Sequence, residues 1–153
     1  MSNLTMSLDV STTGTGWAIY DGLALVKSGV VKPKQKSFYE RAKIMASELK
    51  TVQLRALQKY DKPFDGIVIE KNSVMGPNQQ SMIKIGVVTG MILGRLVADE
   101  IYFVNVSTWR KYWKFSYKDR SKKSMKKQSI ETVEREFKKQ VKDDEADAIL
   151  IGS

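Results

Sequence analysis

The first 31 residues of the chain carry a repeated pattern of strand and turn. Leu4 to Val10 alternates apolar and polar residues, which is typical of a half-buried strand, and turn-forming residues follow from Ser11 to Gly16. Residues 17–20 are apolar again, and Asp21-Gly22 is a hairpin signal before a further strand at residues 23–31. The chain is therefore expected to open with three antiparallel strands.

Beyond residue 31 the pattern alternates between helix and strand. Apolar residues that recur from Phe38 at gaps of four and three predict an amphipathic helix, and the β-branched run before Glu70 predicts a buried strand. The expected elements are a helix at 38–60, a strand at 64–70, a loop at 71–79, a helix at 80–97, a strand at 101–106, and helices at 107–113, 125–139 and 143–151. Together they indicate a mixed α/β layer fold in one domain.

The composition excludes several kinds of chemistry. The chain has no Cys and no His, so thiolate catalysis, His-based triads and zinc or iron–sulfur sites built on these residues are ruled out. A bound metal must be held by oxygen, which suits magnesium, calcium or manganese. The N-terminus lacks a signal-peptide pattern, and the longest apolar stretch, residues 85–94, is too short to span a bilayer. We expect a cytoplasmic protein with no membrane partner.

The net charge of +9 is confined to one part of the chain. Residues 101–142 hold 13 basic and 4 acidic residues, whereas the rest of the chain is neutral. Five aromatic residues are interleaved with this charge: Trp109, Tyr112, Trp113, Phe115 and Tyr117. The combination favours a surface that binds a polyanion, with nucleic acid as the leading partner. The alternative is a solvated basic helix that only keeps the protein soluble.

Four carboxylates stand at the edges of predicted elements. Asp9 and Glu70 lie in apolar strands, and Asp144 and Asp147 share one face of the last helix. Read singly, Asp9 could accept backbone hydrogen bonds in the following turn, Glu70 could pair with a lysine, and the two aspartates could be helix N-terminal charges. If all four converge, they repel one another, and hard divalent cations are the usual counter-charge.

The second long helix carries glycines at positions 86, 90 and 94. Each costs about 1 kcal/mol relative to alanine in a helix, so close approach of another backbone is expected to offset it. The partner is either an element of the same chain or the matching helix of a second subunit. The apolar face around Met82, Val88 and Leu93 is the alternative dimer surface.

Three motifs, taken in order, resemble those of RuvC-type Holliday-junction resolvases of the ribonuclease H-like superfamily. They are LDVSTTGTGWA at residues 8–18, IVIE at 67–70 and DEADA at 144–148. Residues 81–97 also resemble the long glycine-containing helix of that family, so the likeness covers the whole chain. Sugar kinases and actin-like ATPases share the first motif, but they need two such lobes and a much longer chain.

The resemblance implies a fold and an activity. The fold would be a ribonuclease H-like mixed sheet, three antiparallel strands followed by parallel strands, flanked by helices in one nuclease domain over residues 1–153. The activity would be that of a homodimeric, Mg²⁺-dependent endodeoxyribonuclease that places paired nicks in four-way and other branched DNA. Two Mg²⁺ ions are expected, with Mn²⁺ as a substitute. The alternatives are a non-catalytic junction-binding protein and an RNA-cleaving enzyme of the same superfamily.

The resemblance also implies residue roles. Asp9, Glu70, Asp144 and Asp147 would hold the metal, and Lys127 would be the catalytic lysine, with Arg110 in the place of an earlier family lysine and Lys123 as its rival. The expected DNA-binding residues are Arg110, Lys111, Lys118, Lys122, Lys123, Lys126 and Lys127. Family members commonly place an aromatic residue shortly after the glutamate, whereas this chain has Ser73 in that region. The lysine-rich stretch is like that of phage-encoded members, which would act in the cytoplasm of a bacterial host.

Overall fold

The structure is a computed structural model that describes residues 3–70 and 79–152. Within these residues the strands form one five-stranded sheet in the order β3-β2-β1-β4-β5. Its members are β1 (Leu4–Val10), β2 (Thr15–Asp21), β3 (Ala24–Val31), β4 (Phe64–Glu70) and β5 (Glu100–Val104). The first three pair antiparallel, whereas β4 and β5 run parallel to β1 and to each other. The predicted mixed sheet is confirmed. The loop predicted at 71–79, including Ser73, lies outside the described residues except for Gln79.

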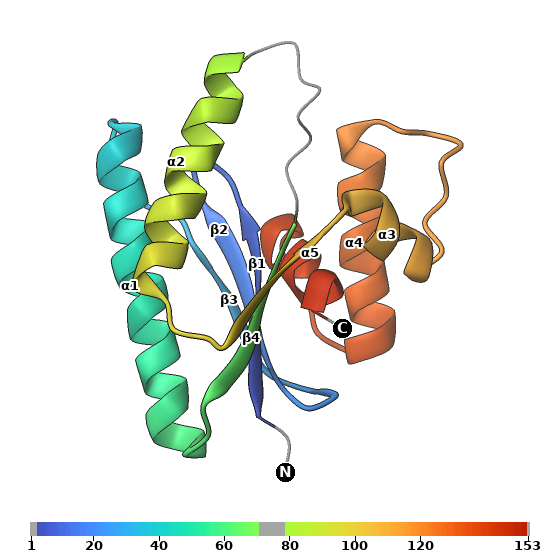
Figure 1. Cartoon of the computed structure of the whole chain (residues 1–153). Helices are drawn as coiled ribbons and strands as arrows, with labels where there is room; N and C mark the ends of the chain where they lie inside the picture. The colour runs from blue at the N-terminus through green and yellow to red at the C-terminus, as the bar shows by residue number, and fades with distance from the viewer. Residues whose placement is uncertain (1–2, 71–78, 153) are drawn as a thin grey trace.

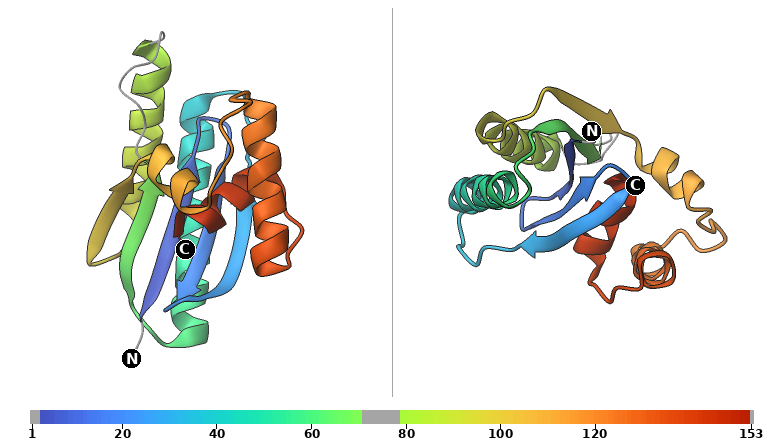
Figure 2. Two further views of the ribbon diagram at one scale, coloured as in Figure 1. Left: turned by 90° about the vertical axis from the view of Figure 1, so that its right-hand side faces the viewer. Right: turned by 90° about the horizontal axis from the view of Figure 1, so that it is seen from below.

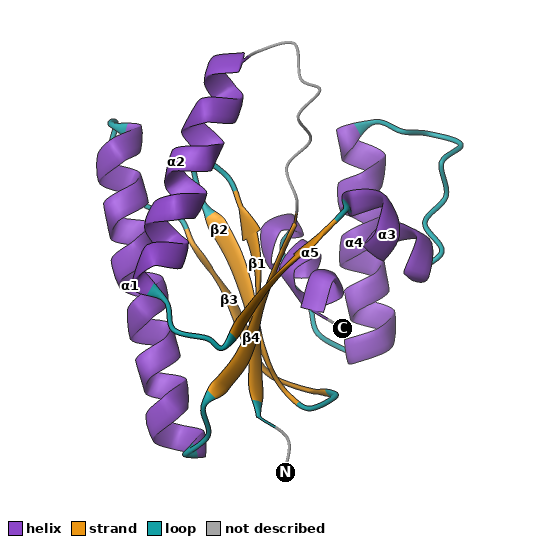
Figure 3. Ribbon diagram, in the orientation of Figure 1, coloured by secondary structure: helices purple, strands orange, loops and turns teal. Residues whose placement is uncertain are grey.

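Helices cover both faces of the sheet (Figure 1). Two long helices, α1 (Phe38–Tyr60) and α2 (Gln79–Arg95), lie on one face, and α5 (Asp143–Gly152) lies on the other, as the view from below in Figure 2 shows. On the α5 side, α3 (Val106–Tyr112) and α4 (Lys122–Phe137) form the outer layer (Figure 3). No helix in the described part of the chain is long and apolar enough to cross a membrane.

Strand β1 separates two hydrophobic cores through its alternating side chains. Leu4, Met6 and Leu8 are fully buried in the core beneath α1 and α2. Ser7 points to the opposite face, where its hydroxyl donates a hydrogen bond to the carbonyl of Ala148 in α5 at 2.5 Å. Residue 9 follows the same alternation as Ser7, so its side chain emerges on the α5 face.

Several element boundaries differ from the predictions: helix α2 ends at Arg95 instead of residue 97 and α4 at Phe137 instead of residue 139. Strand β5 ends at Val104 and Asn105 is the N-cap of α3, so the strand predicted through residue 106 is two residues too long. Helix α4 begins at Lys122, three residues before the predicted start, because the Ser121 hydroxyl accepts a hydrogen bond from the backbone N–H of Ser124 at 3.2 Å. The cap places the first lysines of this segment on a helix.

Three of the aromatic residues expected on the polyanion-binding surface pack in or against the second core: Trp109 and Phe115 are buried in it, and half-buried Trp113 packs against it. Trp109 and Phe115 contact each other edge to face at 5.5 Å, between α3 and the elements around α5. Tyr112 and Tyr117 are exposed, as predicted. A short helix that packs against α4 and α5 needs apolar anchors, and burial of these rings supplies them.

The glycines of α2 do not pack against any other element among the described residues. A Cβ atom at Gly86, Gly90 or Gly94 would meet nothing within 4 Å. Val88 is fully buried in the first core, so the alternative dimer surface around Val88 and Leu93 is mostly internal to the fold. The glycines instead lie on the exposed face of α2, together with the side chains of Ile83, 64% exposed, and Val87, 39% exposed.

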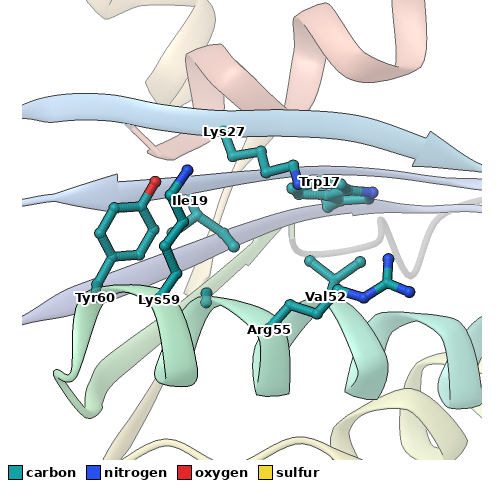
Figure 4. A pocket seen from close by; sticks show the side chains of 8 residues that line it. Trp17, Ile19, Lys27, Val52, Arg55, Lys59 and Tyr60 are labelled. Atoms are coloured by element: carbon teal, nitrogen blue, oxygen red, sulfur yellow. The ribbon is translucent and has the colours of Figure 1, made fainter.

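A small cavity of about 120 Å³ remains between α1 and the sheet, over β2 and β3 (Figure 4). Its lining combines the Trp17 and Ile19 side chains with three cations, Lys27, Arg55 and Lys59. The cavity lies on the α1 face of the sheet, whereas α5 covers the opposite face.

Candidate active site

Asp9 and Glu70 are neighbours because their strands are parallel. The register of β1 and β4 pairs Leu8 with Ile69, so the next residue on each strand is an acid. Asp9 and Glu70 therefore emerge side by side at the carboxyl edge of the sheet, on the α5 face. Each is partly buried, because the apolar core begins one residue earlier.

Gly16 allows α5 to reach this edge. It pairs with Asp9 across β1 and β2, and a Cβ atom at this position would lie 1.9 Å from the backbone carbonyl oxygen of Asp144. Only a glycine permits this contact between the N-terminus of α5 and the sheet. A hydrogen bond of 2.5 Å from the Ser28 hydroxyl to Glu145 also holds the helix start against β3. As a result, Asp144 and Asp147 join the two strand carboxylates.

Each of the four carboxylates lies in an environment that makes its ionised form unfavourable. Burial raises the pKa of Asp9 well above its ordinary value, and neighbouring carboxylates add to the shift. Those neighbours are Asp147, Glu70, Asp144 and Asp143. Burial also raises the pKa of Asp147 to about 7, with Glu70 and Asp144 contributing repulsion. The pKa values of Glu70 and Asp144 are raised mainly by burial. The sequence-predicted acids thus form one electrostatic cluster.

Three cations approach the acid cluster from different elements. In α4, the Lys126 ammonium forms an ion pair with Asp143 at 2.9 Å. After β3, Lys32 lies close enough to Asp144 to oppose the rise of its pKa, which burial causes. In α3, Arg110 acts in the same way on the pKa of Glu70, which burial also raises. By partly neutralising the carboxylates, these cations reduce the electrostatic repulsion within the acid cluster.

Glu70 is held in place by α3. The indole N–H of Trp109 donates a hydrogen bond to the Glu70 Oε1 atom at 2.8 Å. The Arg110 guanidinium lies 5.3 Å from the centre of the same indole ring. The sequence pattern had marked Trp109 only as part of a basic, aromatic surface. Neither its burial nor its link to Glu70 can be read from spacing along the chain.

The predicted basic residues fall into two groups. Arg110 and Lys126 reach the acid cluster. Lys127, predicted as the catalytic lysine, lies 3.9 Å from Glu131 on the exposed side of α4, with 75% of its side chain exposed. Its catalytic role stays a prediction. The other predicted DNA-binding residues, all exposed, are Lys111, Lys118, Lys122 and Lys123. Lys32 was missed, because its electrostatic effect on Asp144 acts between residues more than a hundred positions apart in the sequence.

The residues at the cluster fit a hard divalent cation by the nature of their donors. All four predicted ligands offer carboxylate oxygens, and the buried Oδ1 atom of Asp147 has no hydrogen-bond partner among the described residues. A cation would satisfy that oxygen and offset the repulsion. Within the same residues, no group of three acids is already arranged as a metal site. The ligand assignment therefore stays a prediction.

The fold is that of RuvC, with the ribonuclease H-like mixed sheet. The chain is similar to RuvC of Thermus thermophilus, solved in complex with a Holliday junction substrate, with a TM-score of 0.65 and 14% identity over 98% of this chain and 90% of that one. It is also similar to the yeast mitochondrial Holliday junction resolvase Ydc2, with a TM-score of 0.55 and 11% identity over 98% and 76% of the two chains. The fowlpox virus Holliday junction resolvase gives a TM-score of 0.54 and 14% identity over 97% and 94%.

In sequence, the chain belongs to the DUF3882 family, described as Lactococcus phage M3 protein, whose model matches residues 2–152. None of the curated proteins compared with it is significantly similar in sequence. The resemblance to the RuvC type seen in the motifs is confirmed by the structural similarity, which extends over nearly the whole chain.

A side chain at Gly16 should separate α5 from the sheet. Gly16→Ala is expected to lower the free energy of unfolding by about 2–4 kcal/mol, because the new methyl group overlaps backbone atoms of Asp144. Gln58→Ala is the control, since position 58 is exposed in α1 and alanine favours a helix. Denaturant unfolding of both variants measures the difference; equal stabilities would contradict the proposed close contact.

The raised pKa of Asp147 predicts how stability depends on pH in protein without metal. Below about pH 4 the carboxyl is protonated in both folded and unfolded chains, so it does not lower the free energy of unfolding. As the pH rises toward 7, only the unfolded chain releases the proton readily, so the folded state loses stability. Asp147→Asn should remove this loss and stabilise the protein at pH 8 by on the order of 3 kcal/mol.

Asp143→Asn provides a control of opposite sign. Burial acts to raise the pKa of Asp143, but the ion pair with Lys126 and backbone hydrogen bonds outweigh it and lower the pKa. The charged form is therefore favourable in the folded state, and Asp143→Asn should destabilise the protein at neutral pH. Melting temperatures between pH 4 and pH 8 in the presence of a chelator test both variants. A fall in stability at pH 8 for Asp147→Asn would contradict the electrostatic account.

Proposed function

We propose that the chain is a metal-dependent endonuclease that resolves four-way DNA junctions by paired nicks and also acts on other branched DNA. The observation that carries this proposal is the meeting of four carboxylates at one edge of a RuvC-like sheet, beside a strongly basic surface. The similarity to Holliday junction resolvases supports the substrate class. Cleavage of the DNA backbone is the chemistry for which such a cluster of hard ligands is suited.

The carboxylates of Asp9, Glu70, Asp144 and Asp147 would hold Mg²⁺ or Mn²⁺. These ions would activate water and stabilise the departing oxygen of a phosphodiester. The chain's own residues fix where this occurs. The Trp109 indole keeps one Glu70 oxygen in a fixed position, and the Gly16 contact fixes the start of α5 relative to Asp9. Arg110 and Lys126 supply positive charge at the same edge, where a phosphate would bind.

The basic segment supports binding to the DNA backbone. Ser121 starts α4 so that Lys122, Lys123, Lys126 and Lys127 all lie on its first two turns. All four are exposed, and Lys126 forms an ion pair with Asp143 at the acid cluster. Contacts to phosphates do not read the base sequence. Such a surface therefore suits a protein that recognises branched DNA by its shape. Catalysis by Lys127 is part of the proposal, as predicted from the family motif.

A homodimer would supply the two active sites that paired nicks require. The open face of α2 contains Ile83, Val87, Gly90 and Gly94 at gaps of four, three and four, so they form one stripe. Edge strand β5 adds the exposed side chains of Ile101 and Phe103, which lie on the same face of the sheet as α2. The groove between these elements, about 680 Å³ in volume, also contains Glu70. A second subunit that covers this surface would lie next to the active site.

Substrate choice and catalysis can be tested together. With Mg²⁺, the protein should nick opposed strands of a synthetic four-way junction and leave a linear duplex intact. Asp9→Asn and Glu70→Gln should reduce cleavage at least about 100-fold while junction binding persists, because each removes a negative charge near phosphates. Asp99→Asn, with the same change of charge at the opposite edge of the sheet, should cleave normally.

The same assay separates the alternative functions. Junction binding without cleavage by the wild type would indicate a non-catalytic junction-binding protein. Preferential cutting of an RNA–DNA hybrid would indicate a ribonuclease. Full nicking by Asp9→Asn or Glu70→Gln would exclude the proposed site.

The dimer is tested by a charge on the exposed face of α2. Val87→Arg should produce a folded monomer with impaired paired cleavage, because the charge would be buried between subunits. Leu54→Arg, on the exposed face of α1, is the control and should remain a dimer. Val88→Arg is unsuitable, since Val88 is fully buried and the protein would unfold. Sedimentation velocity at micromolar concentration is the measurement; a monomeric wild type, free and bound to a junction, would rule out the dimer.

A further inference from the structure

The segment Lys32–Ser37 joins β3 to α1 and carries three exposed lysines, Lys32, Lys34 and Lys36. We propose that this loop is a second phosphate-binding element, which holds the DNA backbone on the side of the acid cluster opposite α4. The inference rests on the proposed function, because it assigns a contact to the same DNA substrate. It adds a surface outside residues 101–142, where the sequence concentrates its net positive charge.

The loop is attached directly to the turn that presents Asp9. A Cβ atom at Gly14 would lie 3.2 Å from the Val31 carbonyl oxygen and 3.3 Å from the Lys32 Cγ atom. The side chain of Lys32 therefore lies against the β1–β2 turn, two residues from the glycine that contacts Asp144. This placement explains why the charge of Lys32 acts on Asp144. The first lysine of the loop is thus at the site itself.

Arg41 in α1 fixes the shape of the loop. Its guanidinium donates hydrogen bonds to the backbone carbonyls of Gln35 at 2.9 Å and Lys36 at 2.6 Å. Its Nε–H donates to the carbonyl of Thr12 in the β1–β2 turn at 2.9 Å. One side chain thereby ties both loops together, so the lysines are displayed from a fixed backbone. Less conformational freedom is then lost when they contact a ligand.

The lysines of the loop form no ion pair with a carboxylate of the described residues. No acidic residue occurs from Gly22 to Tyr39. Lys126, by contrast, is already paired with Asp143. The loop therefore offers cations beside the acid cluster that are free to contact a phosphate.

The position of the loop favours a DNA strand as its ligand. A strand that places a phosphate at the acid cluster meets the repulsion of four carboxylates, so flanking phosphates need cations nearby. Helix α4 supplies cations on one side of the sheet, and the loop that leads into α1 supplies them on the other (Figure 1). A DNA backbone that crosses the carboxyl edge between them would contact both.

The experiment compares two triple variants with the same change in charge. One replaces Lys32, Lys34 and Lys36 by Ala. The matched control replaces Lys27, Arg55 and Lys59, the exposed cations around the cavity on the α1 face (Figure 4). Binding of a fluorescent four-way junction is measured against salt concentration, with Ca²⁺ in place of Mg²⁺ to prevent cleavage. Melting temperatures confirm that both variants are folded.

The loop variant should bind at least about fivefold more weakly, and its slope of log affinity against log salt should be shallower by about 2.7, since each of the three lost phosphate contacts removes about 0.9. The control should match the wild type. Equal slopes for the loop variant and the wild type, or equal losses in both variants, would overturn the inference. If the wild type itself neither binds nor cleaves branched DNA, the proposed function fails instead.

Arg41→Lys tests the role assigned to the guanidinium as a positioning group. The variant keeps the positive charge but loses the paired hydrogen bonds to the loop. Trypsin should cut after Lys34 and Lys36 at least about fivefold faster than in the wild type, because the loop is released, and junction affinity should fall with little change of salt slope. Unchanged proteolysis would show that Arg41 does not hold the loop.

Discussion

The contact between Gly16 and the backbone of Asp144 is the constraint on which the candidate site depends. Strand pairing alone brings Asp9 and Glu70 together, because β1 and β4 are parallel and in register. The other two acids arrive from the far end of the chain, and they reach the sheet only because β2 has no side chain at Gly16. At the opposite end of α5 a second glycine does the same: a Cβ atom at Gly152 would lie 2.6 Å from the Ser7 hydroxyl oxygen. The helix is seated against the sheet at both ends, and the geometry of the acids follows.

The close approach of these carboxylates lowers the stability of the folded chain. Asp9 and Asp147 both have raised pKa values, chiefly because burial removes them from water, so their charged forms are unfavourable in the fold. The surrounding structure reduces the repulsion without abolishing it. Lys126 is bonded to Asp143, which lies outside the predicted ligand set, and Trp109 donates to only one oxygen of Glu70. The predicted ligands keep oxygens without protein partners, as the Oδ1 atom of Asp147 shows among the described residues. Unfavourable electrostatic interactions that are concentrated at a few buried carboxylates, within an otherwise well-packed fold, are typical of a functional site.

Local patterns in the sequence were sufficient for the sheet and its order of elements, and for the four acids as candidates. The alternation of apolar and polar residues from Leu4 to Val10 predicts a strand, and the structure confirms it as β1, with Leu4, Met6 and Leu8 in the first core. Most of what failed depended on contacts between distant segments. Trp109 was assigned to a surface, because a tryptophan in a basic segment has the same local pattern whether it faces solvent or a second core. The start of α4 was missed for a local reason, since Ser121 is one of several serines in this segment that could cap the helix. Lys32 has no feature in the sequence that connects it with Asp144, since only the fold brings β3 beside α5.

Helix α3 shows how one short segment joins the core, the acid cluster and the basic surface. Trp109 fills the second core with its ring and orders Glu70 with its N–H group, so packing and site geometry depend on the same side chain. Arg110 lies over that ring and directs its charge to Glu70, whereas Lys111 is exposed. Of these three consecutive residues, Trp109 therefore faces the interior, Arg110 faces the carboxylates and Lys111 faces the solvent. Because a seven-residue helix has little stability of its own, its position depends on the buried indole. The Trp109 side chain thus connects the acid cluster to the second hydrophobic core. Its hydrogen bond to Glu70 also fixes the start of the basic segment, in α3, next to the acid cluster.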